Sequence, residues 1–85
     1  MIDSRKLIFF LTVARKGSYT AAASTLDTVQ SAVSHAIQDL ERDLNCKLMR
    51  RVGRKMVLTE SGHALLDQGR NIELAMNAAR LACLV

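Results

Sequence analysis

The sequence predicts a mainly α-helical fold in which three helices and a two-stranded hairpin precede one long helix. Three observations lead to this class: apolar residues at helical spacing near the N-terminus, two short extended runs around a glycine, and a heptad-like seam near the C-terminus. The chain has 85 residues and no proline, with 49% apolar and 24% charged residues. This composition excludes a disordered tail, and the length favours one small domain with an appended helix.

The first helix begins close to the N-terminus. Its apolar positions have the spacing of one helical face: Leu7, Phe10, Leu11 and Ala14. Asp3 or Ser4 is expected to cap its start, and Gly17 to adopt the left-handed conformation that ends it.

A second, short helix follows, and Ser18 or Thr20 is its expected N-terminal cap. Three consecutive alanines, residues 21–23, allow another helix to approach it closely, and Leu26 completes its apolar face. Residues 27–29 then form a turn.

The third helix is expected from about Gln30 to Leu44, with Asn45 as a left-handed cap. Its buried stripe steps by four, three and four residues: Val33, Ile37, Leu40 and Leu44. Polar side chains with little charge lie away from that stripe: Gln30, Ser31, Ser34, His35 and Gln38.

Two short extended runs, residues 46–51 and 56–58, flank a basic tip at residues 52–55 and predict a small hairpin. Cys46 is interpreted as a small apolar residue at the start of the first strand. The basic residues of this region have no acidic residue among them: Lys47, Arg50, Arg51, Arg54 and Lys55. These five positive charges exceed the net charge of the whole chain, +4, so the excess is concentrated in this region. Such a concentration suits an anion-binding surface.

The last helix is expected to begin after Thr59, its cap, and to run to the end of the chain. Its apolar seam has the spacing of a coiled coil: Leu65, Gly69, Ile72, Met76, Ala79 and Cys83. We therefore divide the chain into a domain at residues 1–58 and a dimerisation helix at residues 59–85. The alternative is that the seam packs on the first helix of the same chain.

Two short helices joined by a tight turn, the second with an exposed polar face, form a helix-turn-helix. Such a helix fits the major groove of DNA, where glutamine pairs with adenine and serine with several groups. The start of the second helix, near Ser18 and Thr20, offers free N–H groups to a phosphate. The hairpin then acts as a wing that reaches phosphates or a minor groove with Arg51, Arg54 and Lys55.

The ordered motifs of residues 7–66 resemble the start of LysR-type bacterial transcription regulators. The first motif is Phe10-x-x-Val13-Ala14-x-x-Gly17-Ser18-Tyr19-Thr20-x-Ala22-Ala23-x-x-Leu26. The second is Gln30-Ser31-Ala32-Val33-Ser34-x-x-Ile37-x-x-Leu40-Glu41, followed by Leu48, Arg51 and Leu58-Thr59-Glu60-Ser61-Gly62. The resemblance implies a winged helix-turn-helix with a linker helix that pairs in a dimer. It also implies binding to double-stranded promoter sites with dyad symmetry, usually as a dimer of dimers.

On this reading the candidate DNA-binding residues have three roles. Those expected to hold phosphates are Ser18, Thr20 and Ser34. Those expected to face bases are Gln30, Ser31, His35 and Gln38. Those expected to anchor the wing are Arg51, Arg54 and Lys55. The candidate dimerisation residues are Leu65, Ile72, Met76, Ala79 and Cys83.

The sequence departs from the family pattern at four positions. Val29 stands where Ser or Thr usually caps the third helix, so Thr28 is a candidate cap one residue earlier. His35 replaces a frequent Arg, which removes a permanent charge from the reading face. Asn45 and Met49 replace the usual Gly and Phe, and both changes are structurally tolerable.

The small-molecule-sensing domain that follows the linker helix in this family is absent from these 85 residues. The chain is therefore expected to be an excised fragment or a naturally short form, and an inducer would bind outside it. The resemblance also allows a tetramer in a full-length form.

Other classes are less favoured by the sequence. No nucleophile–base constellation or phosphate-cradling loop indicates an enzyme, and no cofactor or metal is expected. No apolar run approaches membrane-spanning length and no secretion signal is recognisable, so the cytoplasm is the expected location. The remaining alternative is a protein-interaction module whose last helix pairs with another regulator chain, without DNA binding of its own.

Overall fold

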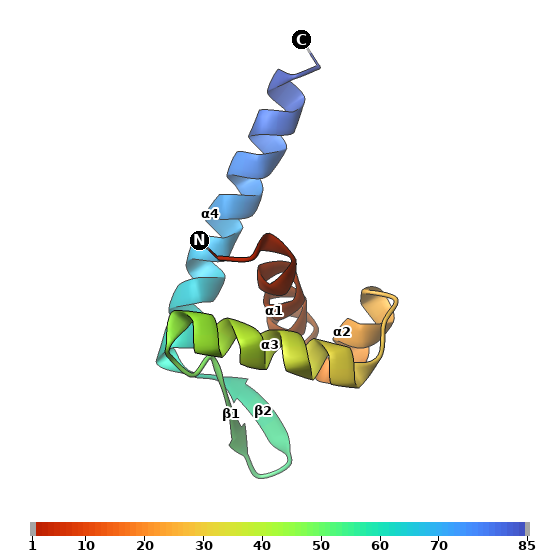
Figure 1. Cartoon of the computed structure of the whole chain (residues 1–85), viewed down its shortest axis with the longest axis vertical. Helices are drawn as coiled ribbons and strands as arrows, with labels where there is room; N and C mark the ends of the chain where they lie inside the picture. The colour runs from red at the N-terminus through yellow and green to blue at the C-terminus, as the bar shows by residue number, and fades with distance from the viewer. Residues whose placement is uncertain (1, 85) are drawn as a thin grey trace.

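The computed structural model describes residues 2–84 and has the predicted order of elements (Figure 1). The helices and strands are α1 (Ser4–Lys16), α2 (Tyr19–Thr25), α3 (Gln30–Leu44), β1 (Met49–Val52), β2 (Lys55–Leu58) and α4 (Glu60–Ala82). Helices α1, α2 and α3 form a compact body. Figure 1 shows α4 extending beyond this body on one side, while the β1–β2 hairpin extends on the other.

Local capping explains where α1 begins and ends. The carboxylate of Asp3 accepts hydrogen bonds from the backbone N–H groups of Arg5 at 2.9 Å and Lys6 at 3.2 Å. Gly17 has φ 78°, and its N–H donates to the carbonyl of Val13. Both predicted ends of the first helix are therefore confirmed, with Asp3 rather than Ser4 as the cap.

The turn between α2 and α3 depends on left-handed backbone at Asp27, which has φ 55°. Val29 is the N-cap of α3 and makes no side-chain capping bond. The alternative in which Thr28 caps the helix one residue earlier is therefore wrong. At the other end of α3, Asn45 has φ 53°, as its predicted role requires.

The hydrophobic core lies where α1 crosses α3, with α2 packed against both. Ala22 and Ala23 are buried, so the small side chains do allow the close approach that the sequence predicts. Leu44 is only partly buried and lies at the edge of this cluster. The buried apolar residues come from all three helices and from the entry into the hairpin: Leu7, Phe10, Leu11, Val13, Ala22, Ala23, Val33, Ile37, Leu40, Leu48 and Met49.

The hairpin is shorter than predicted on its first strand. Strand β1 begins at Met49 rather than at Cys46, and its register with β2 runs from Met49 opposite Leu58 to Val52 opposite Lys55. The preceding residues instead bind α3, because the buried Glu41 carboxylate accepts the backbone N–H groups of Leu48 at 2.8 Å and Met49 at 3.3 Å. Cys46 is therefore not in a strand, although it is half-buried against the core.

Helix α4 begins as predicted, with the Thr59 hydroxyl accepting the N–H of Gly62 at 3.0 Å. Its first half packs on the body through Gly62 and Gly69, which are both buried. The second half has few neighbours and is exposed on most sides. Within residues 2–84 no helix combines the length and apolar character needed to cross a bilayer.

Candidate nucleic-acid interface

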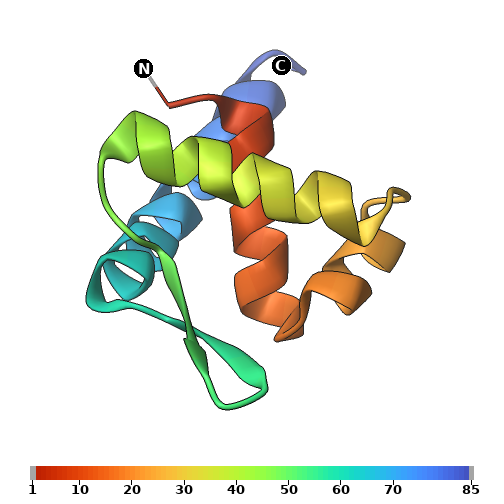
Figure 2. The same cartoon turned by 60° about the horizontal axis from the view of Figure 1, so that its bottom comes forward.

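An open groove of about 1010 Å³ lies between the start of α2, the exposed face of α3 and the hairpin. Figure 2 shows α3 crossing the body with the hairpin extending to one side of it. The groove brings together most of the predicted DNA-binding residues from separate parts of the chain. Those that line it are Ser18, Thr20, Gln30, Ser34, Gln38, Arg51 and Arg54.

Ser18 has a structural function at the mouth of this groove. Its hydroxyl oxygen accepts the N–H of Ala21 at 2.9 Å and so caps α2. Since a serine hydroxyl has one proton to donate and two lone pairs, the proton remains available to an acceptor in the groove.

Thr20 holds the first residue of α3. Its hydroxyl donates to the Gln30 side-chain oxygen at 3.2 Å, across the turn between the two helices. With this oxygen engaged, the two N–H groups of the Gln30 amide remain free to donate, and the oxygen keeps a second lone pair. The predicted phosphate ligand Thr20 is therefore also a positioning residue for the predicted base-reading residue Gln30.

Three predicted residues lie outside the groove. Ser31 and Lys55 are exposed on α3 and at the start of β2 but do not line it. His35 is exposed and borders a smaller hollow of about 350 Å³ between α1 and α3, beside Phe9 and Asp39. The exposed polar face of α3 is therefore wider than the groove, and His35 lies on its far side from the hairpin.

The hairpin carries its basic residues on exposed backbone. Arg51 lies in β1, and Arg54 lies in the two-residue tip after Gly53, whose φ is 62°. All residues from Arg50 to Lys55 are exposed. Because the Glu41 carboxylate accepts the backbone N–H groups at the entry of β1, the basic tip is held at a defined position relative to α3.

The groove is also lined by polar residues that were not among the predicted site residues: Tyr19, Glu41, Arg42, Asn45 and Lys47. Arg42 lies four residues after Gln38, so helical spacing alone places it on the same face. Lys47 belongs to the basic region that the sequence shows. No sequence signal distinguishes Tyr19 from an ordinary core aromatic, because its ring also packs against the buried cluster.

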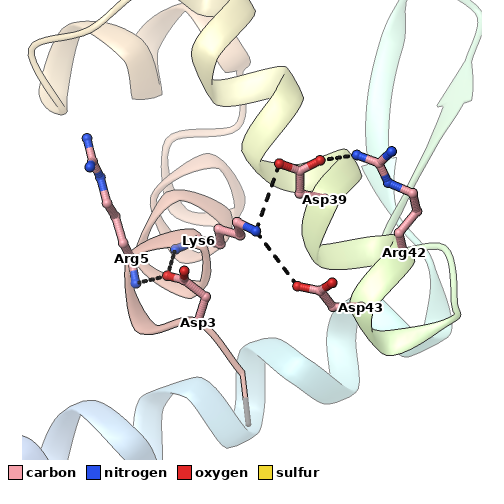
Figure 3. Close-up of polar contacts among 6 residues, drawn as sticks. All are labelled: Asp3, Arg5, Lys6, Asp39, Arg42 and Asp43. Atoms are coloured by element: carbon pink, nitrogen blue, oxygen red, sulfur yellow. Dashed lines mark hydrogen bonds and ion pairs between the residues drawn. The ribbon is translucent and has the colours of Figure 1, made fainter.

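Arg42 is part of an ion-pair network that joins α1 to the second half of α3 (Figure 3). The Asp39 carboxylate pairs with Arg42 and lies 3.9 Å from the Lys6 ammonium, which is also 3.8 Å from Asp43. This network neutralises Asp39 and Asp43 and links α1 to α3 through Lys6.

The predicted seam of α4 divides into two parts. Leu65 is half-buried against the chain's own core, and Gly69 lies against Leu11 of α1. The later seam residues are exposed, with 38% of Ile72 and 54% of Met76 accessible. Ala79 and Cys83 are exposed as well.

An ion pair fixes α4 against α1 beyond the glycine contact. The Arg15 guanidinium donates to both carboxylate oxygens of Glu73, with a distance of 3.1 Å between Nη1 and Oε2. These hydrogen bonds lower the pKa of Glu73 and raise the pKa of Arg15. The pair is exposed, so solvent weakens it.

Comparison with known proteins identifies this architecture. The profile described as "Bacterial regulatory helix-turn-helix protein, lysR family" matches residues 4–63, which span α1 to the first turn of α4. The chain belongs to the LysR family of bacterial regulators. The match supports the prediction that the chain is not an enzyme, since the family is regulatory.

Relatives with this LysR domain are several times longer than the chain. The HTH-type transcriptional regulator YofA of Bacillus velezensis is 44% identical over 82 residues, which are 95% of this chain and 28% of YofA. The regulator GltR of Bacillus subtilis is 44% identical over 73 residues, which are 86% of this chain and 25% of GltR. The chain therefore spans about a quarter of the length of these relatives.

Solved LysR structures share the same fold. The CbnR DNA-binding domain in complex with DNA superposes on this chain with a TM-score of 0.85 and 36% sequence identity. The superposition covers 96% of this chain and 95% of the CbnR domain chain. The BenM DNA-binding domain in complex with catB site 1 DNA has a TM-score of 0.80 at 30% identity, with 96% and 90% covered. The predicted winged helix-turn-helix followed by a long helix is thus confirmed.

Proposed function

We propose that this chain binds double-stranded DNA in a sequence-specific manner, as the DNA-binding part of a LysR-type transcription regulator. The observation that carries the proposal is the groove, in which Gln30 is oriented by Thr20 beside a basic hairpin. An α-helix with free amide donors at its start suits the major groove, where glutamine pairs with adenine. The likeness to domains solved with DNA supports this assignment over a protein-interaction module without DNA binding.

The predicted residues divide between positioning and reading. Ser18 and Ser34 contact phosphates through their hydroxyls, which sets the register of the protein on the duplex. Thr20, whose hydroxyl proton is given to Gln30, contacts a phosphate through its backbone N–H at the start of α2. Gln30, Ser31, His35 and Gln38 face base edges. A helix inside the major groove has DNA on both sides of its exposed face, so His35 remains a candidate reader although it lies outside the groove beside the hairpin.

The basic residues of the hairpin supply affinity that does not depend on sequence. Arg51, Arg54 and Lys55 are exposed at or near its tip, where they can reach phosphates or the minor groove. Each cation that neutralises a phosphate releases a counterion, so binding must weaken as salt rises.

We further propose that two copies associate through α4. The exposed apolar seam from Ile72 to Cys83 continues beyond the part of α4 that the body covers. A second copy of α4 would remove this surface from water and place two α3 helices symmetrically, as promoter sites with dyad symmetry require. In a full-length regulator, which would act in the cytoplasm, an inducer would bind a domain outside this chain.

A site selection from a random duplex pool tests both proposals. We expect a selected site with dyad symmetry, bound by a dimer. Met76→Asp should shift the protein to monomer and weaken binding to the full site more than to a half-site. The matched control Asn77→Asp adds the same charge one residue away from the seam and should leave the dimer intact. Selected sites without symmetry, or equal effects of the two variants, would contradict the dimer.

A further inference from the structure

Tyr19 is the only tyrosine of the chain and the first residue of α2. It lies between two predicted phosphate-contacting residues, Ser18 and Thr20, and lines the same groove. Its ring is half-buried against the hydrophobic core, which fixes its place in the fold. The ring alone gives it a structural role, but a phenylalanine would serve that role equally well.

The hydroxyl of Tyr19 is an unused donor. Within residues 2–84 the Tyr19 hydroxyl makes no hydrogen bond with another protein group. In the same residues, no enclosed side-chain oxygen or nitrogen lacks a hydrogen-bond partner. Since the Tyr19 hydroxyl has no partner and is not among such enclosed atoms, it is accessible to solvent. The structure therefore holds the phenol ring in place while its hydroxyl remains open to a ligand.

The surroundings favour an anionic oxygen as that ligand. Lys47, Arg51 and Arg54 line the groove together with Tyr19. The buried Glu41 also borders the groove, but one of its carboxylate oxygens already accepts two backbone N–H groups. Burial, and then the charge of Glu41, raise the pKa of Tyr19, so its hydroxyl keeps its proton at neutral pH.

We infer that the Tyr19 hydroxyl donates a hydrogen bond to a phosphate of the DNA backbone lying in the groove between α3 and the hairpin. This inference rests on the proposed DNA binding. A neutral donor releases no counterion, so Tyr19 adds affinity without changing the salt dependence. A phosphate contact carries no base information, so it adds this affinity on every sequence.

Tyr19→Phe tests the contact because it removes only the hydroxyl. We expect roughly tenfold weaker binding to specific and random duplexes alike, as for a hydrogen bond to a charged acceptor. The salt slope, the base preference and the thermal unfolding midpoint should not change. The control Ser24→Ala removes an exposed hydroxyl from the same helix outside the groove and should leave binding unchanged.

Methylphosphonate substitution, one phosphate at a time, locates the contact. The wild-type chain should lose affinity at one phosphate where Tyr19→Phe loses none. Three results would each overturn the inference. Tyr19→Phe could bind as tightly as wild type, or it could lose affinity only at the selected site. Its loss of affinity relative to wild type could also remain the same at every methylphosphonate position. If the folded wild-type chain binds no duplex, both the proposed function and this contact are wrong. If the wild-type chain binds DNA and Tyr19→Phe binds equally well, the proposed function stands and only this contact is wrong.

Discussion

A β-carbon on Gly62 would lie 2.2 Å from the carbonyl oxygen of Leu48, so the first turn of α4 is in backbone contact with the entry to the hairpin. The same carbonyl accepts the N–H of Thr59 at 3.0 Å. The Thr59 hydroxyl in turn donates to the carbonyl of Lys47 at 2.5 Å. This junction sets the direction of α4 relative to the basic hairpin, and hence the seam relative to the proposed DNA-binding surface.

Gly62→Ala should destabilise the fold. Alanine favours helix by up to about 1 kcal/mol over glycine, but the clash here is with backbone that cannot turn aside. We expect a net loss of about 1–3 kcal/mol in urea unfolding. Gly69→Ala is the comparison, because its nearest neighbour is a terminal methyl group of Leu11 and should yield at lower cost. A Gly62→Ala variant as stable as wild type would show that the junction is loose.

Glu73→Gln should change the acid stability of the chain. The hydrogen bonds from Arg15 lower the pKa of Glu73 in the folded state. Their contribution is therefore present above the ordinary glutamate pKa of about 4.3 and is lost as pH falls through the lowered value. Because solvent screens the exposed pair, the variant should lose at most about 1 kcal/mol at neutral pH.

Thermal unfolding of Glu73→Gln at neutral and acid pH measures this difference. The variant and wild type should converge at low pH, where the wild-type carboxylate is protonated. Asp67→Asn is a control on the same helix, since its carboxylate lies 3.9 Å from Arg70 and forms no link to α1. A stability gap between Glu73→Gln and wild type that persists in acid would exclude the ion pair as its source.

Gln30→Ala should cost about 1–3 kcal/mol of binding at the preferred site and relax base choice there. Thr20→Val keeps the side-chain shape but removes the hydroxyl that holds Gln30. Thr20→Val should therefore reduce base discrimination less than Gln30→Ala does. In a chain that already carries Gln30→Ala, Thr20→Val should have no further effect on base discrimination. A double-mutant cycle with duplexes changed at each position measures the coupling, and additive losses would mean that Thr20 acts independently of Gln30.

Arg54→Ala should weaken binding to all duplexes alike and reduce the salt slope by about one unit. The tip position of Arg54, after the left-handed Gly53, places it among the exposed residues of the hairpin. Binding isotherms at several salt concentrations, on selected and random duplexes, measure both effects. If Arg54→Ala altered base preference alone, its role would be base reading and not phosphate contact.

Much of the fold follows from short-range signals. The start of α1 at Asp3, its end at Gly17 and the cap of α4 at Thr59 all depend on residues within one helical turn. The end of α3 at Leu44 follows from the spacing of its apolar stripe and from Asn45, the left-handed residue after it. Such signals are readable in a sequence because both partners of each interaction lie close together along the chain.

The sequence-based expectations are less accurate where contacts between residues far apart in the chain determine the structure. Strand β1 starts three residues later than predicted because Glu41, on α3, binds the backbone of Leu48 and Met49. The first part of the α4 seam packs against the body of the same chain, since Gly69 lies against Leu11 of α1. Helical spacing places residues on a face but does not reveal which partner covers that face.

The same limit applies to the site. The groove-lining role of seven predicted residues followed from their type and order, whereas Tyr19 resembles a core aromatic until its open hydroxyl is seen. His35 shares the exposed part of α3 with Gln38, yet it borders the hollow next to α1. Its position depends on how α1 crosses α3.

The most direct test of the central claim is fluorescence anisotropy of a labelled random-sequence duplex, titrated with the whole chain at several salt concentrations. Circular dichroism of the same sample shows that the chain is folded. Contacts from the basic hairpin and the groove predict binding at low salt that weakens steeply and linearly in logarithmic coordinates as salt rises. Absence of binding at low salt by the folded chain would contradict the DNA-binding account.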